Sequence, residues 1–170
     1  GLKITTTLDY DMQKLAEESI TKHAETNLNK YGANNASIIS LDPNNGQILA
    51  MVGSKDFKNE EIQGQNNLTT SPRQPGSSFK PFVYAAAFLK GYAPSTVVYD
   101  IKTTFNNDGT KYTPDNYTGK FKGPVSMRNA LGGSLNIPAI KAGYLAGMDN
   151  VMNLVRGMGV PIPEDTYGLA

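Results

Sequence analysis

The sequence predicts an α+β fold in which an antiparallel pair of strands lies among helices, and three observations predict it. Apolar residues recur at helical spacing over residues 9–32. Two runs typical of β-strands, 36–41 and 47–52, follow with a Pro/Asn/Gly cluster between them. An unbroken apolar run, 82–89, then comes directly after a turn signal and predicts a buried helix. With 170 residues and no internal repeat, the chain is expected to form one domain or part of one.

The first predicted helix has recognisable ends. Asp9 is a good N-cap, and Gly32 suits the left-handed residue that closes a helix. Between them runs one apolar stripe: Met12, Leu15, Ala16, Ile20, Ala24 and Leu28. The only histidine, His23, lies on this helix near charged residues, which favours a solvated surface side chain.

Turn chemistry between the two β-type runs indicates a hairpin. The connecting segment, 42–46, ends on Asn45-Gly46, a dipeptide typical of tight hairpin turns. Residues 54–76 are rich in Asn, Gln, Ser and Thr, and we expect a long surface loop there.

The second half of the sequence predicts four helices. The first runs from about Ser77 to Lys90 and is stopped by Gly91. Residues 92–124 are punctuated by Pro and Gly and are expected to be mostly irregular. Three shorter helices follow: one capped by Ser126 and running through Leu131, one with Pro138 in its first turn and running through about Ala146, and one capped by Asp149 and ending near Gly157.

Composition excludes several classes of function. The net charge is +1, with sixteen Lys and Arg against fifteen Asp and Glu, and no basic block suggests a nucleic-acid partner. The absence of Cys removes disulfides, thiol nucleophiles and Cys-zinc sites. The longest apolar run, 82–89, is far shorter than the ~20 residues of a membrane helix.

Most catalytic constellations lack their residues in this chain. One His and no Cys leave no material for a Ser-His-Asp triad, a Cys-His dyad or a His-rich metal site. No GxxxxGK[ST] or GxGxxG occurs, so a phosphate cradle has no support. We therefore expect no cofactor and no metal. A serine can still be activated by a neutral lysine, which Ser-x-x-Lys places one helical turn away.

Ser-x-x-Lys occurs twice, in different settings. Ser19 and Lys22 lie in the middle of the first predicted helix, on a polar face that keeps the lysine charged. Ser77 instead falls at a helix start behind the turn Pro75-Gly76, where unpaired backbone N–H groups favour an alkoxide. Lys80 follows one turn later among Phe and Pro residues, whose burial would lower its pKa. The pattern predicts Ser77 as a nucleophile and Lys80 as its base.

Ser134-Leu135-Asn136 supplies two residue types that a lysine base needs. The hydroxyl of Ser134 can relay a proton, and the amide of Asn136 can hold the lysine or a substrate carbonyl. Gly132-Gly133 before them permits close approach of the backbone.

Three longer stretches resemble one known family. They are "RQPGSSFKPF" at 73–82, "YTPDNYTGKFKGPVSMRNALGGSLNIPAI" at 112–140 and "ASIISLDPNNGQILAMVGS" at 36–54. Together they are similar to the transpeptidase domain of penicillin-binding proteins, specifically the bifunctional class A type, and good matches run from about Ile4 to Ala170. The resemblance implies an antiparallel sheet flanked by helices.

The resemblance also implies a serine acyltransferase that cross-links peptidoglycan stem peptides. Ser77 would attack the carbonyl of a terminal D-Ala-D-Ala and expel the last D-alanine. Lys80 would be the general base, Ser134 the proton relay and Asn136 a positioning amide, and the last two would also contact the substrate. A second stem-peptide amine would then take the acyl group, and β-lactams would acylate the same serine.

The family's third motif, Lys-Thr-Gly or Lys-Ser-Gly on a later strand, is absent from these residues. In the family, that strand contributes an oxyanion N–H and part of the carboxylate site. Residues 1–170 are therefore expected to be the N-terminal part of a single transpeptidase domain and to be inactive alone. The expected partners include the rest of that domain and an upstream glycosyltransferase domain. An upstream anchor would hold the protein at the extracytoplasmic face of the bacterial cell membrane.

Two other functions stay open at this point. A serine β-lactamase shares the fold and Ser-x-x-Lys, but class A β-lactamases also need Glu-x-x-x-Asn, and the segment that begins at Glu164 ends in Gly168. A non-catalytic β-lactam sensor would keep all four site residues. Rapid nitrocefin turnover would favour the first, and genuine peptide cross-linking would exclude the second.

Overall fold

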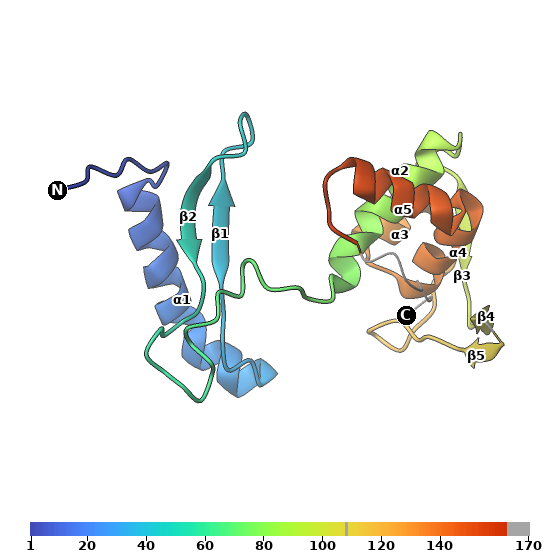
Figure 1. Ribbon diagram of the computed structural model, residues 1–170. Helices are drawn as coiled ribbons and strands as arrows, with labels where there is room; N and C mark the ends of the chain where they lie inside the picture. Colours follow the sequence, from blue (N-terminus) through green and yellow to red (C-terminus); the bar gives the residue numbers. More distant parts are fainter. Residues whose placement is uncertain (108, 163–170) are drawn as a thin grey trace. The chain divides into compact units, whose positions relative to one another are not determined.

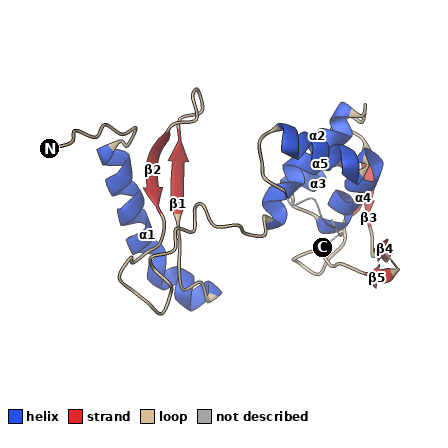
Figure 2. Ribbon diagram, in the orientation of Figure 1, coloured by secondary structure: helices blue, strands red, loops and turns tan. Residues whose placement is uncertain are grey.

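The structure is a computed structural model that describes residues 1–107 and 109–162. It divides into two compact units, residues 1–74 and residues from 75 onward. Figure 1 traces both units and Figure 2 shows their secondary structure. No helix in the described part of the chain is both long and apolar enough to cross a membrane.

The first unit contains one long helix and one hairpin. Helix α1 (Tyr10–Tyr31) begins after Asp9, whose carboxylate accepts a hydrogen bond from the backbone N–H of Met12 at 3.0 Å. It ends at Gly32, which has a φ of 66° that few residues other than glycine adopt readily. Both predicted ends of this helix are confirmed.

The hairpin pairs β1 (Ile38–Leu41) with β2 (Ile48–Val52) in antiparallel register, from Ile38 opposite Val52 to Leu41 opposite Ile48. Helix α1 lies against β2 (Figure 1), and the buried apolar residues of this unit are Ala16, Ile20 and Ala50. The segment from 53 to 75 has turns but neither helix nor strand, which confirms the predicted loop.

Within the described residues, the second unit contains the other helices and two short pairs of strands. A 3₁₀ helix, η1 (Gly76–Phe79), runs directly into α2 (Lys80–Leu89). The later helices are α3 (Met127–Gly132), α4 (Asn136–Ala146) and α5 (Met148–Gly157). Strand β3 (Val97–Asp100) pairs with β6 (Gly123–Ser126), and β4 (Phe105–Asn107) pairs with β5 (Thr110–Tyr112), both antiparallel.

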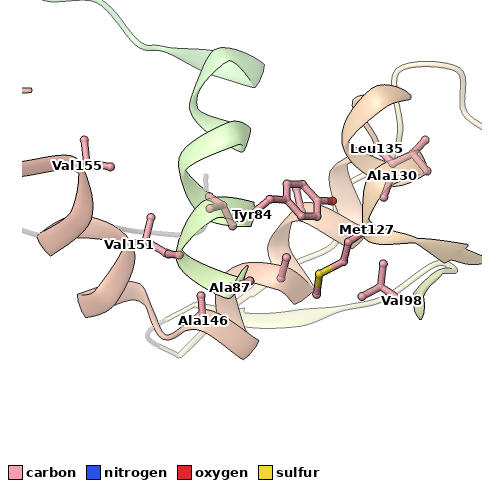
Figure 3. Packing of buried hydrophobic residues seen from close by; sticks show 13 residues of the cluster. Tyr84, Ala87, Val98, Met127, Ala130, Leu135, Ala146, Val151 and Val155 are labelled. Carbon is pink, nitrogen blue, oxygen red and sulfur yellow. The ribbon is translucent and has the colours of Figure 1, made fainter. Parts of the chain in front are cut away.

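The core of this unit surrounds α2, which packs against α4 and α5. Figure 3 shows the side chains that meet there: Tyr84, Ala87, Val98, Met127, Ala130, Leu135, Ala146, Val151 and Val155. Small residues of α2 and α4 meet in this core, so the two helices pack directly against each other.

One sequence prediction is wrong in this unit, and several short strands were not predicted. Residues 92–124 are mostly irregular, as expected, but they also contain β3, β4, β5 and the start of β6. These strands have three or four residues each, too few for a visible alternation, and Pro124 is tolerated because the β3–β6 sheet has only two strands. Asp149 does not cap α5 but lies within its first turn, after the cap residue Gly147.

Candidate active site

The predicted nucleophile Ser77 lies in η1, immediately before α2. Gly76 adopts a φ of 53°, which turns the chain into η1. Ser78 secures the turn, since its hydroxyl and its backbone N–H both donate to the carbonyl oxygen of Pro75. The side chain of Ser77 is exposed, and its hydroxyl has no hydrogen-bond partner among the described residues. The Ser78 hydroxyl is thus hydrogen-bonded to the backbone, whereas the Ser77 hydroxyl is exposed and forms no hydrogen bond with a described residue.

Lys80, the first residue of α2, reaches across to the region of Ser134. Its Nζ donates to the carbonyl oxygen of Ser134 at 2.7 Å, to the Ser134 hydroxyl at 3.2 Å and to Oδ1 of Asn136 at 2.7 Å. These three acceptors match the three donors of an ammonium group. Burial lowers the pKa of Lys80, because a half-buried site disfavours its charged form.

Ser134 follows α3 in a strained conformation. Its φ of 50° is unusual for a residue with a side chain, and the cost of such a conformation is about 1–3 kcal/mol. Hydrogen bonds on both sides hold it there: the N–H of Ser134 donates to Leu131, and the N–H of Leu135 donates to Ala130. As a result, the carbonyl and the hydroxyl of Ser134 both lie within reach of one lysine.

Asn136 begins α4 and has a fixed amide orientation. Its Nδ2 donates to the carbonyl oxygen of Asp115 at 2.7 Å, so Oδ1 is the atom presented to Lys80. Its backbone N–H donates to Oδ1 of Asn116 at 2.8 Å. The structure therefore brings together Lys80, Ser134 and Asn136, and places Ser77 one turn before the lysine without a hydrogen bond between the two.

Two other sequence candidates belong to the first unit. In the first unit, Lys22 and His23 are exposed on α1, as predicted for surface residues. Glu164, weighed as a β-lactamase glutamate, lies outside the described residues. Within residues 1–107 and 109–162, no three His, Cys, Asp or Glu side chains are grouped so that they could hold a metal ion.

Sequence reasoning missed two residues behind the site, Asp100 and Asn116. Both are buried, with exposed fractions of 0% and 5%, and the Nδ2 atom of Asn116 donates to both carboxylate oxygens of Asp100 at 2.8 and 3.0 Å. Neither belongs to a spacing motif. Only the presence of an acid at the end of a short strand could have drawn attention to Asp100, and that strand was not predicted.

Comparison with known families identifies the class to which this fold and site belong. The profile of the family described as "Penicillin binding protein transpeptidase domain" matches residues 36–166. The chain therefore belongs to the penicillin-binding protein transpeptidase family.

Curated relatives agree with this assignment. The chain is 32% identical over 163 residues to penicillin-binding protein 2D of Bacillus subtilis, covering 94% of this chain and 23% of that protein. It is 32% identical over 161 residues to penicillin-binding protein 1A of Neisseria gonorrhoeae, covering 88% of this chain and 20% of that protein. The chain thus spans less than a quarter of the length of these relatives, and the resemblance to class A proteins is confirmed.

Solved structures confirm the α+β fold. Penicillin-binding protein 1A from Haemophilus influenzae aligns with a TM-score of 0.68 at 36% identity, covering 75% of this chain and 19% of that one. The PonA1 protein from Mycobacterium tuberculosis, in complex with penicillin V, aligns with a TM-score of 0.75 at 26% identity, covering 96% of this chain and 41% of that one.

Proposed function

We propose that this chain carries the acylation site of a peptidoglycan D,D-transpeptidase, with Ser77 as nucleophile and Lys80 as general base. The observation that supports this most is the position of the Lys80 amine, within 3.2 Å of the Ser134 hydroxyl and one turn after an exposed serine. Because burial lowers the pKa of Lys80, a larger share of this lysine than of an exposed one is in the neutral form that can accept a proton from a serine hydroxyl.

Acylation follows from these positions in two proton transfers. Neutral Lys80 takes the hydroxyl proton of Ser77, and the Ser77 oxygen attacks the carbonyl carbon of the penultimate D-alanine of a stem peptide. The resulting tetrahedral intermediate collapses when Lys80, through the hydroxyl of Ser134, returns a proton to the leaving amine of the last D-alanine. The products are an acyl-serine ester and free D-alanine.

Transfer reverses these roles. The amine of a second stem peptide attacks the ester carbonyl, and the hydroxyl of Ser134 relays the proton of that amine to Lys80. Lys80 returns a proton to the Ser77 oxygen as the ester bond breaks, which leaves a cross-linked peptide and a free Ser77 hydroxyl. Asn136 holds Lys80 through Oδ1 and contacts the substrate. β-Lactams mimic the dipeptide and acylate the same serine.

The proposal extends to the full-length protein. Its partners are stem peptides, the strand with the third motif from the rest of the domain, and an upstream glycosyltransferase domain. An upstream anchor places it on the extracytoplasmic face of the cell membrane. Residues 1–170 then form the N-terminal part of one transpeptidase domain.

Mass spectrometry tests the assignment of the nucleophile. Full-length protein treated with penicillin should gain one penicilloyl mass, and peptide mapping should locate it on Ser77. Ser78→Ala should still be acylated and Ser77→Ala should not, because of these two serines only Ser77 has a lysine at the i+3 position. An adduct on any other serine would contradict the assignment.

Replacing the base tests the role of Lys80. Lys80→Ala should slow acylation by more than ~10²-fold, the scale of general-base catalysis, while the protein remains folded. A rate within a few-fold of wild type would mean that another group takes the proton.

A further inference from the structure

A buried carboxylate, that of Asp100, lies at the end of β3 and is linked by hydrogen bonds to Asn136, one of the two residues that bind Lys80. Asp100 is fully buried, and it forms no ion pair with any described residue. Its two oxygens accept three hydrogen bonds: two from Nδ2 of Asn116, and one from the backbone N–H of Lys122 at 2.9 Å. Burying a carboxylate costs free energy unless it is hydrogen-bonded. Its hydrogen bonds are therefore costly to break, and they hold the donor groups in place.

Asn116 connects this carboxylate to α4. Because its Nδ2 faces Asp100 and the carbonyl oxygen of Lys120, its Oδ1 must face the opposite way, where it accepts the N–H of Asn136 at 2.8 Å. The residue at the N-cap position of α4, Leu135, has no side chain that could accept this bond. Asn136 is the first residue of α4, so its N–H is one of those that a helix start leaves without an intrahelical partner, and Asn116 supplies the acceptor for it from a distant loop.

Asn136 is held at two points by one dipeptide. Asn116 binds its backbone N–H, and the carbonyl oxygen of the preceding residue, Asp115, binds its side-chain Nδ2. These two contacts fix where α4 begins and which amide atom faces Lys80. Displacing the Asp115-Asn116 segment would shift or rotate the Asn136 amide, and with it the lysine amine.

We propose that Asp100 and Asn116 are positioning residues that align Lys80 for proton transfer, acting through Asn136; this inference rests on the proposed function of Ser77 and Lys80. Neither residue touches the reacting atoms. Asp100 orients Asn116, Asn116 and its neighbour orient Asn136, and Asn136 orients the lysine amine.

Exchanging the two side chains separates positioning from general stability. In Asp100→Asn alone, the Nδ2 group of the new amide must face a hydrogen-bond donor. That donor is either Nδ2 of Asn116 or the backbone N–H of Lys122, so one hydrogen bond is lost. In the double variant Asp100→Asn/Asn116→Asp, the amide at 100 donates to the carboxylate at 116, accepts the N–H of Lys122, and leaves an oxygen for the N–H of Asn136. Recovery should be partial, because the carbonyl of Lys120 then faces an oxygen.

The experiment measures the acylation rate constant of full-length protein with a fluorescent penicillin, alongside the melting temperature of each variant. Asn116→Ala and Asp100→Asn should each slow acylation by about 10- to 100-fold, the loss expected when a catalytic group moves by about 1 Å. The double exchange should recover most of that loss. Val155→Ala, which removes methyl groups from the core on α5, is the matched control: it should lower the melting temperature while acylation stays within a few-fold of wild type.

Asn116→Ser covers the case in which Asn116→Ala does not fold, because it keeps a polar group beside Asp100 but is too short to hold Asn136. If folded Asn116 variants are acylated at the wild-type rate, or if the double exchange recovers nothing while remaining folded, the positioning inference is overturned and the proposed function stands. If wild-type protein is not acylated on Ser77, the proposed function itself is overturned.

Discussion

At the scale of single residues, the proposed chemistry depends on the pKa of Lys80, on which two effects act in opposite directions. Three acceptors surround its amine, which favours the ammonium form, whereas burial disfavours it. None of the three acceptors is a carboxylate, so no full negative charge among them stabilises the cation. A modest loss of solvent can therefore lower the pKa of Lys80.

The acylation rate should depend on pH through Lys80. Only the neutral amine can take the proton of Ser77, so the rate should rise with pH and level off above the pKa of Lys80. Because burial lowers that pKa, the midpoint should lie below the usual lysine value of 10.5. Stopped-flow acylation of full-length protein measures it. Lys90→Met, which removes an exposed lysine bonded to Leu145, should leave the midpoint unchanged. A midpoint at or above 10.5 would argue against Lys80 as base.

Tyr84 presents the opposite case, a polar group for which the described residues supply no partner. Its hydroxyl is buried in the core around α2 (Figure 3), and it has no hydrogen-bond partner among residues 1–107 and 109–162. Burial raises the pKa of this phenol, and the nearby charge of Asp100 raises it further. An unsatisfied buried hydroxyl destabilises the folded state.

Tyr84→Phe should therefore keep the free energy of unfolding unchanged or raise it by about 1 kcal/mol, because it removes only the unpaired hydroxyl. Tyr144→Phe is the control, since its exposed hydroxyl does donate to the carbonyl of Asn106 at 3.3 Å. Urea unfolding of both variants gives the comparison. A loss of more than about 1 kcal/mol in Tyr84→Phe would reveal a hydrogen-bond partner for the hydroxyl.

At the scale of elements, the outer edge of β2 is occupied by the chain itself. Gln13 on α1 both accepts from the N–H of Met51 at 2.8 Å and donates to its carbonyl oxygen at 3.2 Å. The N–H of Asp9 donates to Leu49, and the hydroxyl of Thr7 donates to Ile48. A strand that extended this sheet would therefore have to pair with β1.

Gln13→Ala should destabilise the first unit by about 1–2 kcal/mol, because it leaves two backbone groups of Met51 without their partner. Glu18, an exposed residue of the same helix, provides the control, and Glu18→Ala should change stability little. Hydrogen exchange at the Met51 amide reports directly on this contact. If exchange there is equally slow in Gln13→Ala, then something other than Gln13 protects the β2 edge.

Sequence reasoning succeeded for elements whose signals are local. The cap at Asp9, the hairpin turn at Asn45-Gly46 and the spacing of Ser77 and Lys80 are all readable within a few residues. The meeting of Lys80 with Ser134 and Asn136 was anticipated only because each belongs to a short motif. The Asp100–Asn116 pair was missed, because it joins residues sixteen apart through strands too short to show a period.

At the scale of the whole molecule, the hairpin exposes large apolar side chains to solvent. Ile39, Leu41 and Ile48 of the hairpin have exposed fractions of 42%, 52% and 38%. A two-stranded ribbon is marginal in water without further partners. The resemblance implies that later strands of the same domain complete this sheet, and β1 is the strand whose second edge is unpaired among the described residues.

The last prediction concerns residues 1–170 expressed alone, which should show no detectable labelling by a fluorescent penicillin. Ser77 and Ser134 are exposed, and the groups that the described residues bring to the site hold the lysine rather than the substrate carboxylate. The resemblance assigns half of the oxyanion hole and the carboxylate site to the third-motif strand, which this sequence lacks. Adding the remainder of the domain as a second polypeptide should restore labelling at Ser77 by pairing with β1. Stoichiometric labelling of a purified, monomeric 1–170 fragment would show that Lys80, Ser134 and Asn136 suffice for acylation without that strand.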